Sequence, residues 1–578
     1  MTNTSLLSLN DIPKYQKRSF VPNDADFSDV KTVTGLYEKL YMRAIRSTNE
    51  LESFVLDRSE LDAAVGQYGS ILYIYMTCQT DDVKRADAYK AFIETIVPAI
   101  KPLEDRLNHK FLKDLEIYGL DEIRYQVYIR DVKCNTELFV DDNVPLQTKV
   151  DLLSQEYQTV NGAMTVEFEG KERTLPEMSK YLLEPDRDLR ERAWRATAER
   201  RLKDRDKLEE IFDKMRELRN TVAKNAGFAN FRDYQFKAYH RFDYTPDDCK
   251  KYHRVMENFM VPLIKEIADV RKKQMKLSDL RPWDGAVDPL NRAPLKPFHE
   301  VDELISKSST VFHRTDPELG RQFDDMKESG LLDLASRKGK APGGYQSTLT
   351  EARKPFIFMN AVGLERDVRT LLHEGGHAFH AIACASDPVV DYRHAPMEFC
   401  EVASMAMELL AGDHIDVFYS TEDAKRSKRE HLEDILEVLV WVANVDAFQH
   451  WIYEHPKHTA EDRRNMWVSL NKRFGGDATN WQGLENIREY MWHRQLHIFE
   501  VPFYYIEYGI AQLGALQLWR QARENPKQAL ANYRNGLKLG GSRPLPELYK
   551  AAGIEFDFSE KTIAPLVALV KAEWERLV

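Results

Sequence analysis

Cysteine is scarce in this chain of 578 residues, and its distribution argues against stabilisation by disulfides or by a cysteine-bound metal. The five cysteines are odd in number, widely spaced and include no CxxC pair: Cys78, Cys134, Cys249, Cys384 and Cys400. This pattern argues against a disulfide framework and against a zinc site built from several cysteines. We interpret them as reduced thiols packed as small apolar side chains, which indicates a cytoplasmic protein.

Long apolar runs and an excess of positive charge are also missing. No stretch approaches the roughly 18 consecutive apolar residues of a membrane-spanning helix. The first twenty residues show no basic region followed by an apolar core, so no secretory signal is expected. The formal net charge of -11 argues against the broad basic surface with which proteins bind the phosphate backbone of nucleic acids. We therefore expect neither membrane insertion nor nucleic-acid binding.

Strand signals are few, and most of the chain has the apolar spacing of helices, so the fold class is expected to be mainly α. The clearest helical stretches are residues 30–47, 81–115, 186–227 and 247–276. A hairpin is predicted over Met164–Leu175, and one short buried strand over Lys354–Asn360. We place a domain boundary near residue 200, between an N-terminal helical domain, 1–200, and a catalytic domain, 201–578.

The segment His373-Glu374-Gly375-Gly376-His377 is an HExxH motif. At about 100° per residue the two histidines lie about 40° apart, one turn along a helix, so both imidazoles can reach one metal ion. The glutamate lies beside the pair and is placed to take a proton from a metal-bound water. The two glycines each cost a helix about 1 kcal/mol relative to alanine, which suggests the close approach of another backbone.

The motif lies in the stretch DVRTLLHEGGHAFHAIA, for which we predict an amphipathic helix with Asp367 as its N-cap. A third ligand is needed, because a catalytic zinc keeps one position for water. The next predicted helix carries Glu398, Glu401 and Glu408 in an apolar context, where unpaired carboxylates are costly to bury. Helical spacing leaves the choice among these three open.

Two other histidine patterns are not interpreted as metal sites. His380 also lies on the histidine face, but about two turns from His373, too far to share an ion with it on a straight helix. His493 and His497 repeat the i,i+4 spacing without a glutamate between them, so we do not expect a second metal site there.

Three segments together resemble the oligoendopeptidase F and thimet oligopeptidase family of zinc metallopeptidases. They are Asp367–His380 around the motif, FCEVAS at Phe399–Ser404, and the aromatic block LHIFEVPFYYIEYG at Leu496–Gly509. The resemblance runs, in order, through roughly the last two thirds of the chain. It implies a two-lobed helical fold with a deep central substrate channel and a small β element beside the HExxH helix.

The resemblance also implies the roles of individual residues. Glu401 opens the family's E-x-x-S element and would be the third zinc ligand. Family members hold the oxyanion of the scissile carbonyl with a histidine and tyrosines from a C-terminal helix, which correspond here to His497, Tyr505 and Tyr508. Phenol donors aimed at developing negative charge suit that chemistry. Tyr504 remains a possible substitute for Tyr505.

The expected function is therefore that of a zinc metalloendopeptidase that cuts internal bonds of short, unstructured oligopeptides. One zinc ion per chain would be held by His373, His377 and Glu401, with Glu374 as general base. A related helical metallocarboxypeptidase is the first alternative. A catalytically silent peptide-binding protein is the second, although the base, the ligands and the tyrosine pair are all present.

Overall fold

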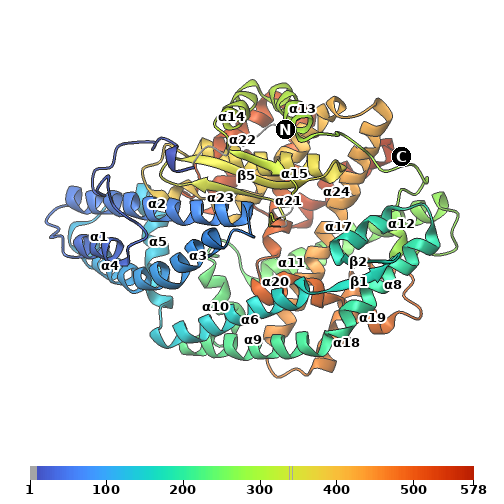
Figure 1. Ribbon diagram of the computed structural model, residues 1–578, viewed down its shortest axis with the longest axis horizontal. Coiled ribbons are helices and arrows are strands. Elements are labelled where there is room, and N and C mark those ends of the chain that lie inside the picture. The colour runs from blue at the N-terminus through green and yellow to red at the C-terminus, as the bar shows by residue number, and fades with distance from the viewer. Residues whose placement is uncertain (1–8, 338, 342, 578) are drawn as a thin grey trace. The chain divides into compact units, whose positions relative to one another are not determined.

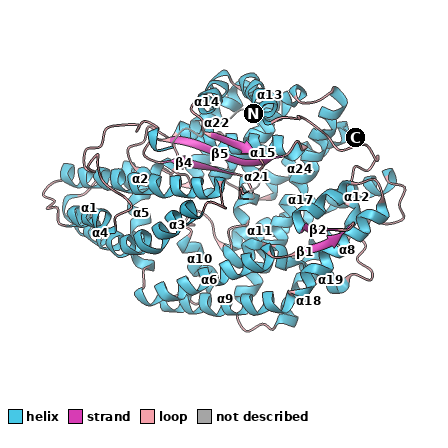
Figure 2. Ribbon diagram, in the orientation of Figure 1, coloured by secondary structure: helices cyan, strands magenta, loops and turns pink. Residues whose placement is uncertain are grey.

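The computed structural model describes residues 9–337, 339–341 and 343–577, and its chain is mainly helical with few strands, as predicted (Figure 2). The contacts divide the chain into two compact units. Unit 1 comprises the chain up to Glu137, Leu295–Lys428 and Ala511–Phe556. Unit 2 comprises Leu138–Pro294, Arg429–Ile510 and the chain from Asp557 onward. A separate N-terminal domain ending at residue 200 stays a prediction.

Unit 1 begins with a helical bundle, drawn in blue in Figure 1. Its helices are α1 (Val30–Tyr41), α2 (Thr48–Cys78), α3 (Val83–Ala91), α4 (Val97–Tyr118) and α5 (Glu122–Leu138), of which the last residue belongs to unit 2. The bundle packs around fully buried side chains that include Leu51, Phe54, Leu107 and Phe111. Burial of such side chains contributes about 1.5–3 kcal/mol each, so this core holds the bundle together.

The rest of unit 1 contains a small mixed sheet and the helices around it. The helices are α13 (Val301–Thr315), α14 (Pro317–Glu328), α15 (Glu365–Ala383), α16 (Met397–Ala411), α22 (Pro526–Leu537) and α23 (Leu545–Ala551). The strands are β3 (Leu332–Ala335), β4 (Tyr345–Leu349) and β5 (Lys354–Ala361), in the order β3-β5-β4. The central strand β5 runs parallel to β3 and antiparallel to β4. It confirms the predicted buried strand.

Helix α15 packs against β5 and β4, side by side in Figure 1. The residues of β5 from Pro355 to Met359 are all buried, which agrees with their nearly continuous apolar sequence. The expected β element beside the HExxH helix is therefore confirmed.

Unit 2 contains a second set of helices and one hairpin. Its helices are α6 (Val144–Gly162), α7 (Leu175–Met178), α8 (Arg187–Lys203), α9 (Arg205–Asn225), α10 (Phe231–Ala238), α11 (Pro246–Val255), α12 (Val261–Gln274), α18 (Ala460–Asn471), α19 (Glu485–Arg488), α20 (Leu496–Glu500) and α24 (Glu560–Leu577). The predicted hairpin is confirmed as β1 (Thr165–Phe168) paired antiparallel with β2 (Lys171–Thr174). Glu169 and Gly170 both have positive φ, as a two-residue hairpin turn requires.

Besides α5, two longer helices belong to both units, because the division between the units falls within them. They are α17 (Thr421–Glu454), divided after Lys428, and α21 (Ile506–Glu524), divided after Ile510.

The predicted helical stretches are present, although the first ends early, at Tyr41, and the other three are interrupted. The stretch 186–227 is two helices, α8 and α9, which meet at Asp204. The stretch 247–276 is divided by a π-helical turn, Met256–Met260, which lies before Pro262 in the first turn of α12. Proline lacks the backbone N–H that a continuous α-helix needs, so the ladder changes there. Among the described residues, none of the helices is both long and apolar enough to cross a membrane.

Candidate metal centre

The HExxH segment lies in the middle of helix α15, as its spacing predicts. The helix starts at Glu365, two residues before the predicted N-cap. Asp367 instead occupies the first turn, where its carboxylate accepts hydrogen bonds from the backbone N–H groups of Val362 and Leu364 at 2.8 and 2.9 Å. The prediction that Asp367 is the N-cap is wrong, because an acidic residue at the third position can bond back to the preceding chain.

The two glycines of the motif let neighbouring elements approach α15 closely. A Cβ atom on Gly376 would lie 2.5 Å from the carbonyl oxygen of Ala403 and 2.6 Å from the Cα of Ser404, both in the backbone of α16. A Cβ atom on Gly375 would lie 2.7 Å from the ring of Phe312 in α13. The close backbone approach predicted from the sequence is therefore found at Gly376, and it brings α16 next to the histidines.

Helix α16 presents its carboxylates at different places along α15. The Oε2 atom of Glu401 lies 3.4 Å from Nε2 of His373 and 3.6 Å from Nε2 of His377. Oε1 of Glu408, two turns further on, is hydrogen-bonded to Nδ1 of His373 at 2.7 Å. Glu398 is buried and does not join this donor group. The structure thus separates three glutamates that helical spacing could not.

The donor atoms of His373, His377 and Glu401 fit a zinc ion. Ligand atoms about 2.1 Å from one tetrahedral zinc ion lie about 3.4 Å from one another. The distances of 3.4 and 3.6 Å match that separation, and all three donors lie within 4.8 Å of one another. Two imidazoles and one carboxylate are also a donor set that leaves one position for water.

The hydrogen bonds around these donors orient them. The carboxylate of Glu408 fixes the ring of His373 and leaves Nε2 directed at Glu401, the arrangement in which a carboxylate supports a metal-binding histidine. The hydroxyl of Ser404 donates to Oε2 of Glu401 at 2.9 Å. Sequence reasoning missed both contacts. The i,i+3 spacing of Glu401 and Ser404 could have indicated the second, since such residues share a helix face.

The two histidines of this site have pKa values shifted in opposite directions. Burial lowers the pKa of His377 to about 4, so its ring is neutral at pH 7 and offers a lone pair. Burial would also lower the pKa of His373, but hydrogen bonds to Glu401 and Glu408 raise it well above the ordinary value. The two carboxylates that attract a proton there would attract a metal cation in the same way.

Glu374 lies between the histidines in sequence, and its carboxyl is almost completely buried. Burial raises its pKa to about 7, with a further increase from the negative charge of Glu401. The backbone N–H of Gln346 in β4 donates a hydrogen bond to this carboxyl. The sheet edge therefore holds Glu374 beside the donor group without making it a member of that group.

The three residues predicted to contact the oxyanion gather in unit 2. The ring of His497 lies 4.8 Å from that of Tyr505 and 5.9 Å from that of Tyr508. Tyr504 belongs to the same aromatic cluster, 5.4 Å from Tyr508. Burial lowers the pKa of His497 to about 4 and raises that of Tyr505 to about 12, so both are neutral at pH 7.

The chain reaches this aromatic cluster differently from the prediction. Tyr505 and Tyr508 were expected on one helix with His497 two turns earlier. Instead α20 ends at Glu500, a turn with Phe503 in the left-handed region follows, and α21 begins at Ile506, after Tyr505. The turn, rather than helical periodicity, brings these rings together.

The other two histidines considered from the sequence, His380 and His493, are buried in other surroundings. His380 lies against the ring of Phe399, and burial lowers its pKa to about 3. His493 contacts Glu209 at 3.1 Å, and Glu209 also forms an ion pair with Arg463. Neither histidine belongs to a metal-binding group among the residues that the structure describes.

Comparison with known proteins adds an independent line of evidence. Over 347 residues the chain is 25% identical to an oligoendopeptidase F homolog of Borreliella burgdorferi, covering 57% of this chain and 56% of that protein. Over 375 residues it is 24% identical to oligopeptidase PepF of Bacillus subtilis, covering 62% and 53%. The chain thus matches about half the length of these curated relatives.

The fold is similar over almost the whole chain to the solved structure of PZ peptidase A with an inhibitor. The TM-score is 0.87 at 26% sequence identity, and the alignment covers 96% of this chain and 99% of the other. The sequence model of peptidase family M3 matches residues 181–566, a segment that contains α15, α16 and the aromatic cluster. The chain belongs to peptidase family M3.

Proposed function

We propose that this protein is a zinc-dependent metalloendopeptidase that hydrolyses internal peptide bonds of short, unstructured oligopeptides. The observation that carries the proposal is the convergence of His373, His377 and Glu401 with zinc-like separations, next to the buried carboxyl of Glu374. Family membership supports it, as does the similarity to proteins named oligoendopeptidase and oligopeptidase.

In this mechanism His373, His377 and Glu401 would hold one zinc ion per chain. The chemistry that zinc would supply there is polarisation of a carbonyl oxygen and acidification of a water molecule. Glu374 takes the proton from the attacking water, which its position beside the ligands allows. It then delivers that proton to the nitrogen of the leaving amine.

The tyrosines and the histidine of unit 2 would act on the substrate carbonyl. We propose that Tyr505, Tyr508 and His497 donate hydrogen bonds to the oxygen on which negative charge develops. This role rests on the family resemblance, and the neutral state of His497 and Tyr505 at pH 7 is compatible with it. The carboxyl of Glu408 and the hydroxyl of Ser404 would position the ligands His373 and Glu401.

The assignment of the base is tested by Glu374→Gln. This variant removes the proton acceptor and leaves the donor group intact, so zinc content should equal that of the wild type while turnover is lost. Glu365→Gln, in the first turn of the same helix and outside the donor group, is the matched control and should retain turnover. Full peptide hydrolysis by Glu374→Gln would rule out Glu374 as the base.

The reaction type is tested by the masses of products from a defined peptide with blocked ends. An endopeptidase releases internal fragments, and hydrolysis should stop when a chelator is present. Stepwise loss of single residues from the C-terminus of an unblocked peptide would instead indicate a carboxypeptidase. Absence of zinc together with absence of hydrolysis would favour a silent peptide-binding protein.

A further inference from the structure

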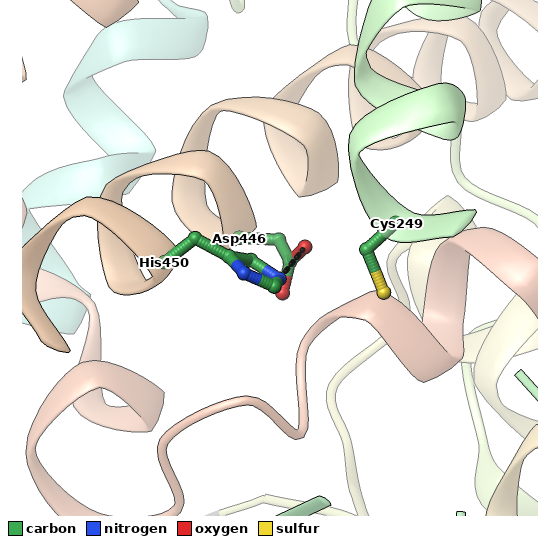
Figure 3. Close-up of side chains that lie close together, drawn as sticks. All are labelled: Cys249, Asp446 and His450. Carbon is green, nitrogen blue, oxygen red and sulfur yellow. Dashed lines mark ion pairs between the residues drawn. The ribbon is translucent and has the colours of Figure 1, made fainter. Parts of the chain in front are cut away.

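A second group of metal-binding side chains lies in unit 2 and is built from two helices. Cys249 and His253 are four residues apart on α11, and Asp446 and His450 are four residues apart on α17. Residues with this spacing share one face of a helix, so each helix directs two such side chains toward the other. Figure 3 shows three of these side chains, Cys249, Asp446 and His450, directed toward a common region.

The distances within this group are those of potential ligands. The Nε2 atom of His450 lies 3.3 Å from Oδ2 of Asp446. The sulfur of Cys249 and donor atoms of Asp446 and His450 all lie within 4.8 Å of one another. His253 is bonded to the same carboxylate, with its Nε2 atom 2.7 Å from Oδ2 of Asp446. A histidine that hydrogen-bonds a carboxylate ligand in this way fixes its orientation.

The group is enclosed by the protein interior. All four residues are at most 4% exposed, and the carboxylate of Asp446 is fully buried. The rings of Phe236 and Phe503 lie 5.9 and 5.3 Å from that of His450. In such apolar surroundings an isolated charge costs several kcal/mol unless it is compensated.

Hydrogen bonding within the protein leaves the ring of His450 and one oxygen of Asp446 unsatisfied. Neither ring nitrogen of His450 has a hydrogen-bond partner among the described residues, and the same holds for Oδ1 of Asp446. Buried polar atoms without partners are rare, and a bound ion is one of the few physical explanations.

We propose that Cys249, Asp446 and His450 form a second, structural binding site for a divalent zinc-class cation, with His253 as the positioning residue of Asp446. On binding, the thiol of Cys249 loses its proton to solvent and its sulfur bonds to the ion. Thiolate, carboxylate and neutral imidazole then balance the two positive charges, which leaves a site without net charge. Oδ1 of Asp446 can supply a fourth donor atom, so the ion would be closed off and would link α11 to α17.

Of the two groups of potential ligands, only the group of Cys249, Asp446 and His450 contains sulfur. Cobalt bound to a thiolate gives a characteristic absorption band, so Co²⁺ can distinguish the two sites. The wild-type protein is produced with Co²⁺ as the supplied metal, and its metal content and near-ultraviolet absorption are measured. We expect close to two cobalt ions per chain and a thiolate-to-cobalt charge-transfer band. Cys249→Ser should lose the band and one metal equivalent. Cys384→Ser, a buried cysteine in unit 1, should keep both.

A second variant guards against misfolding of Cys249→Ser. The double variant His373→Ala, His377→Ala removes donors of the first site and should retain one cobalt ion and the whole thiolate band. Wild-type protein with one cobalt ion and no thiolate band would overturn the proposal, as would a band that survives in Cys249→Ser. Because the experiment does not measure peptide hydrolysis, its outcome is independent of the proposed peptidase function.

Discussion

Replacement of Gly376 by alanine tests whether the contact between α15 and α16 is as close as the structure shows. The new Cβ atom would lie 2.5 Å from the carbonyl oxygen of Ala403, whereas real Cβ contacts essentially never fall below 3.0 Å. The two backbones must therefore separate by at least about 0.5 Å at this point. Because the contact is with backbone, no side-chain rotation can relieve it.

The expected magnitude follows from two opposing effects. Overpacking of a well-packed site costs about 1–3 kcal/mol, whereas alanine favours a helix over glycine by about 1 kcal/mol. Gly35, an exposed position within α1 where an added Cβ meets no atom within 4 Å, isolates the second effect. Gly35→Ala should stabilise the protein by up to about 1 kcal/mol, and Gly376→Ala should be about 1–3 kcal/mol less stable than Gly35→Ala.

The assay is urea unfolding of metal-free protein, since bound metal would add to the measured stability. A separate titration compares zinc affinity, which should fall in Gly376→Ala because Ala403 and Ser404 are close to Glu401 on α16. If Gly376→Ala is as stable as Gly35→Ala and binds zinc with wild-type affinity, the inferred backbone contact is not the reason for the glycine.

Three further predictions concern other features of the structure. Glu408→Ala removes the carboxylate that orients His373, so zinc affinity, measured by chelator competition, should fall about 10–100-fold. Arg241→Ala leaves the buried partner Glu507 without its ion pair and should lower the free energy of unfolding by about 3–5 kcal/mol in urea. Backbone N–H groups that donate to Glu60 lower its pKa although burial raises it, so Glu60→Gln should lose less stability than wild type on acidification below pH 4.5.

The sign of the last prediction follows from proton binding. With a folded pKa below the ordinary 4.5, the unfolded chain binds more protons at Glu60 as the pH falls. The stability from this group is therefore present above 4.5 and lost as the pH falls through the folded pKa. A glutamine at this position does not titrate, so identical acid sensitivity of variant and wild type would contradict the argument.

The other two predictions have their own controls. Glu408→Gln keeps an oxygen that can accept from His373 and should retain more zinc affinity than Glu408→Ala; equal loss in both variants would point to the charge rather than the hydrogen bond. Arg106→Ala breaks an ion pair in which both side chains are 43% exposed, and should cost much less stability than Arg241→Ala, because solvent screens an exposed pair. A similar cost at Arg241 would mean that Glu507 is compensated in another way.

Local patterns in the sequence were sufficient for the elements that carry the candidate site. The i,i+4 spacing of His373 and His377 predicts one helix face, because the helical period is a property of the backbone alone. The turn residues Glu169 and Gly170 identify a hairpin, and the apolar run in β5 identifies a buried strand. These features depend on neighbours in the chain and can be recognised without the fold.

Contacts between distant segments were decided only by the tertiary structure. Glu401 and Glu408 are carboxylates on the same helix. Only the packing of α16 against α15 brings Glu401 to the Nε2 side of His373 and Glu408 to its Nδ1 side. Cys249 and Asp446 are almost 200 positions apart in the chain, so no local sequence motif predicts that they lie in one group. The sequence shows which side chains can bind a metal, and the packing of helices decides which of them meet. Ligand distances depend on shifts of about an ångström between helices, which helix propensity and residue spacing do not encode.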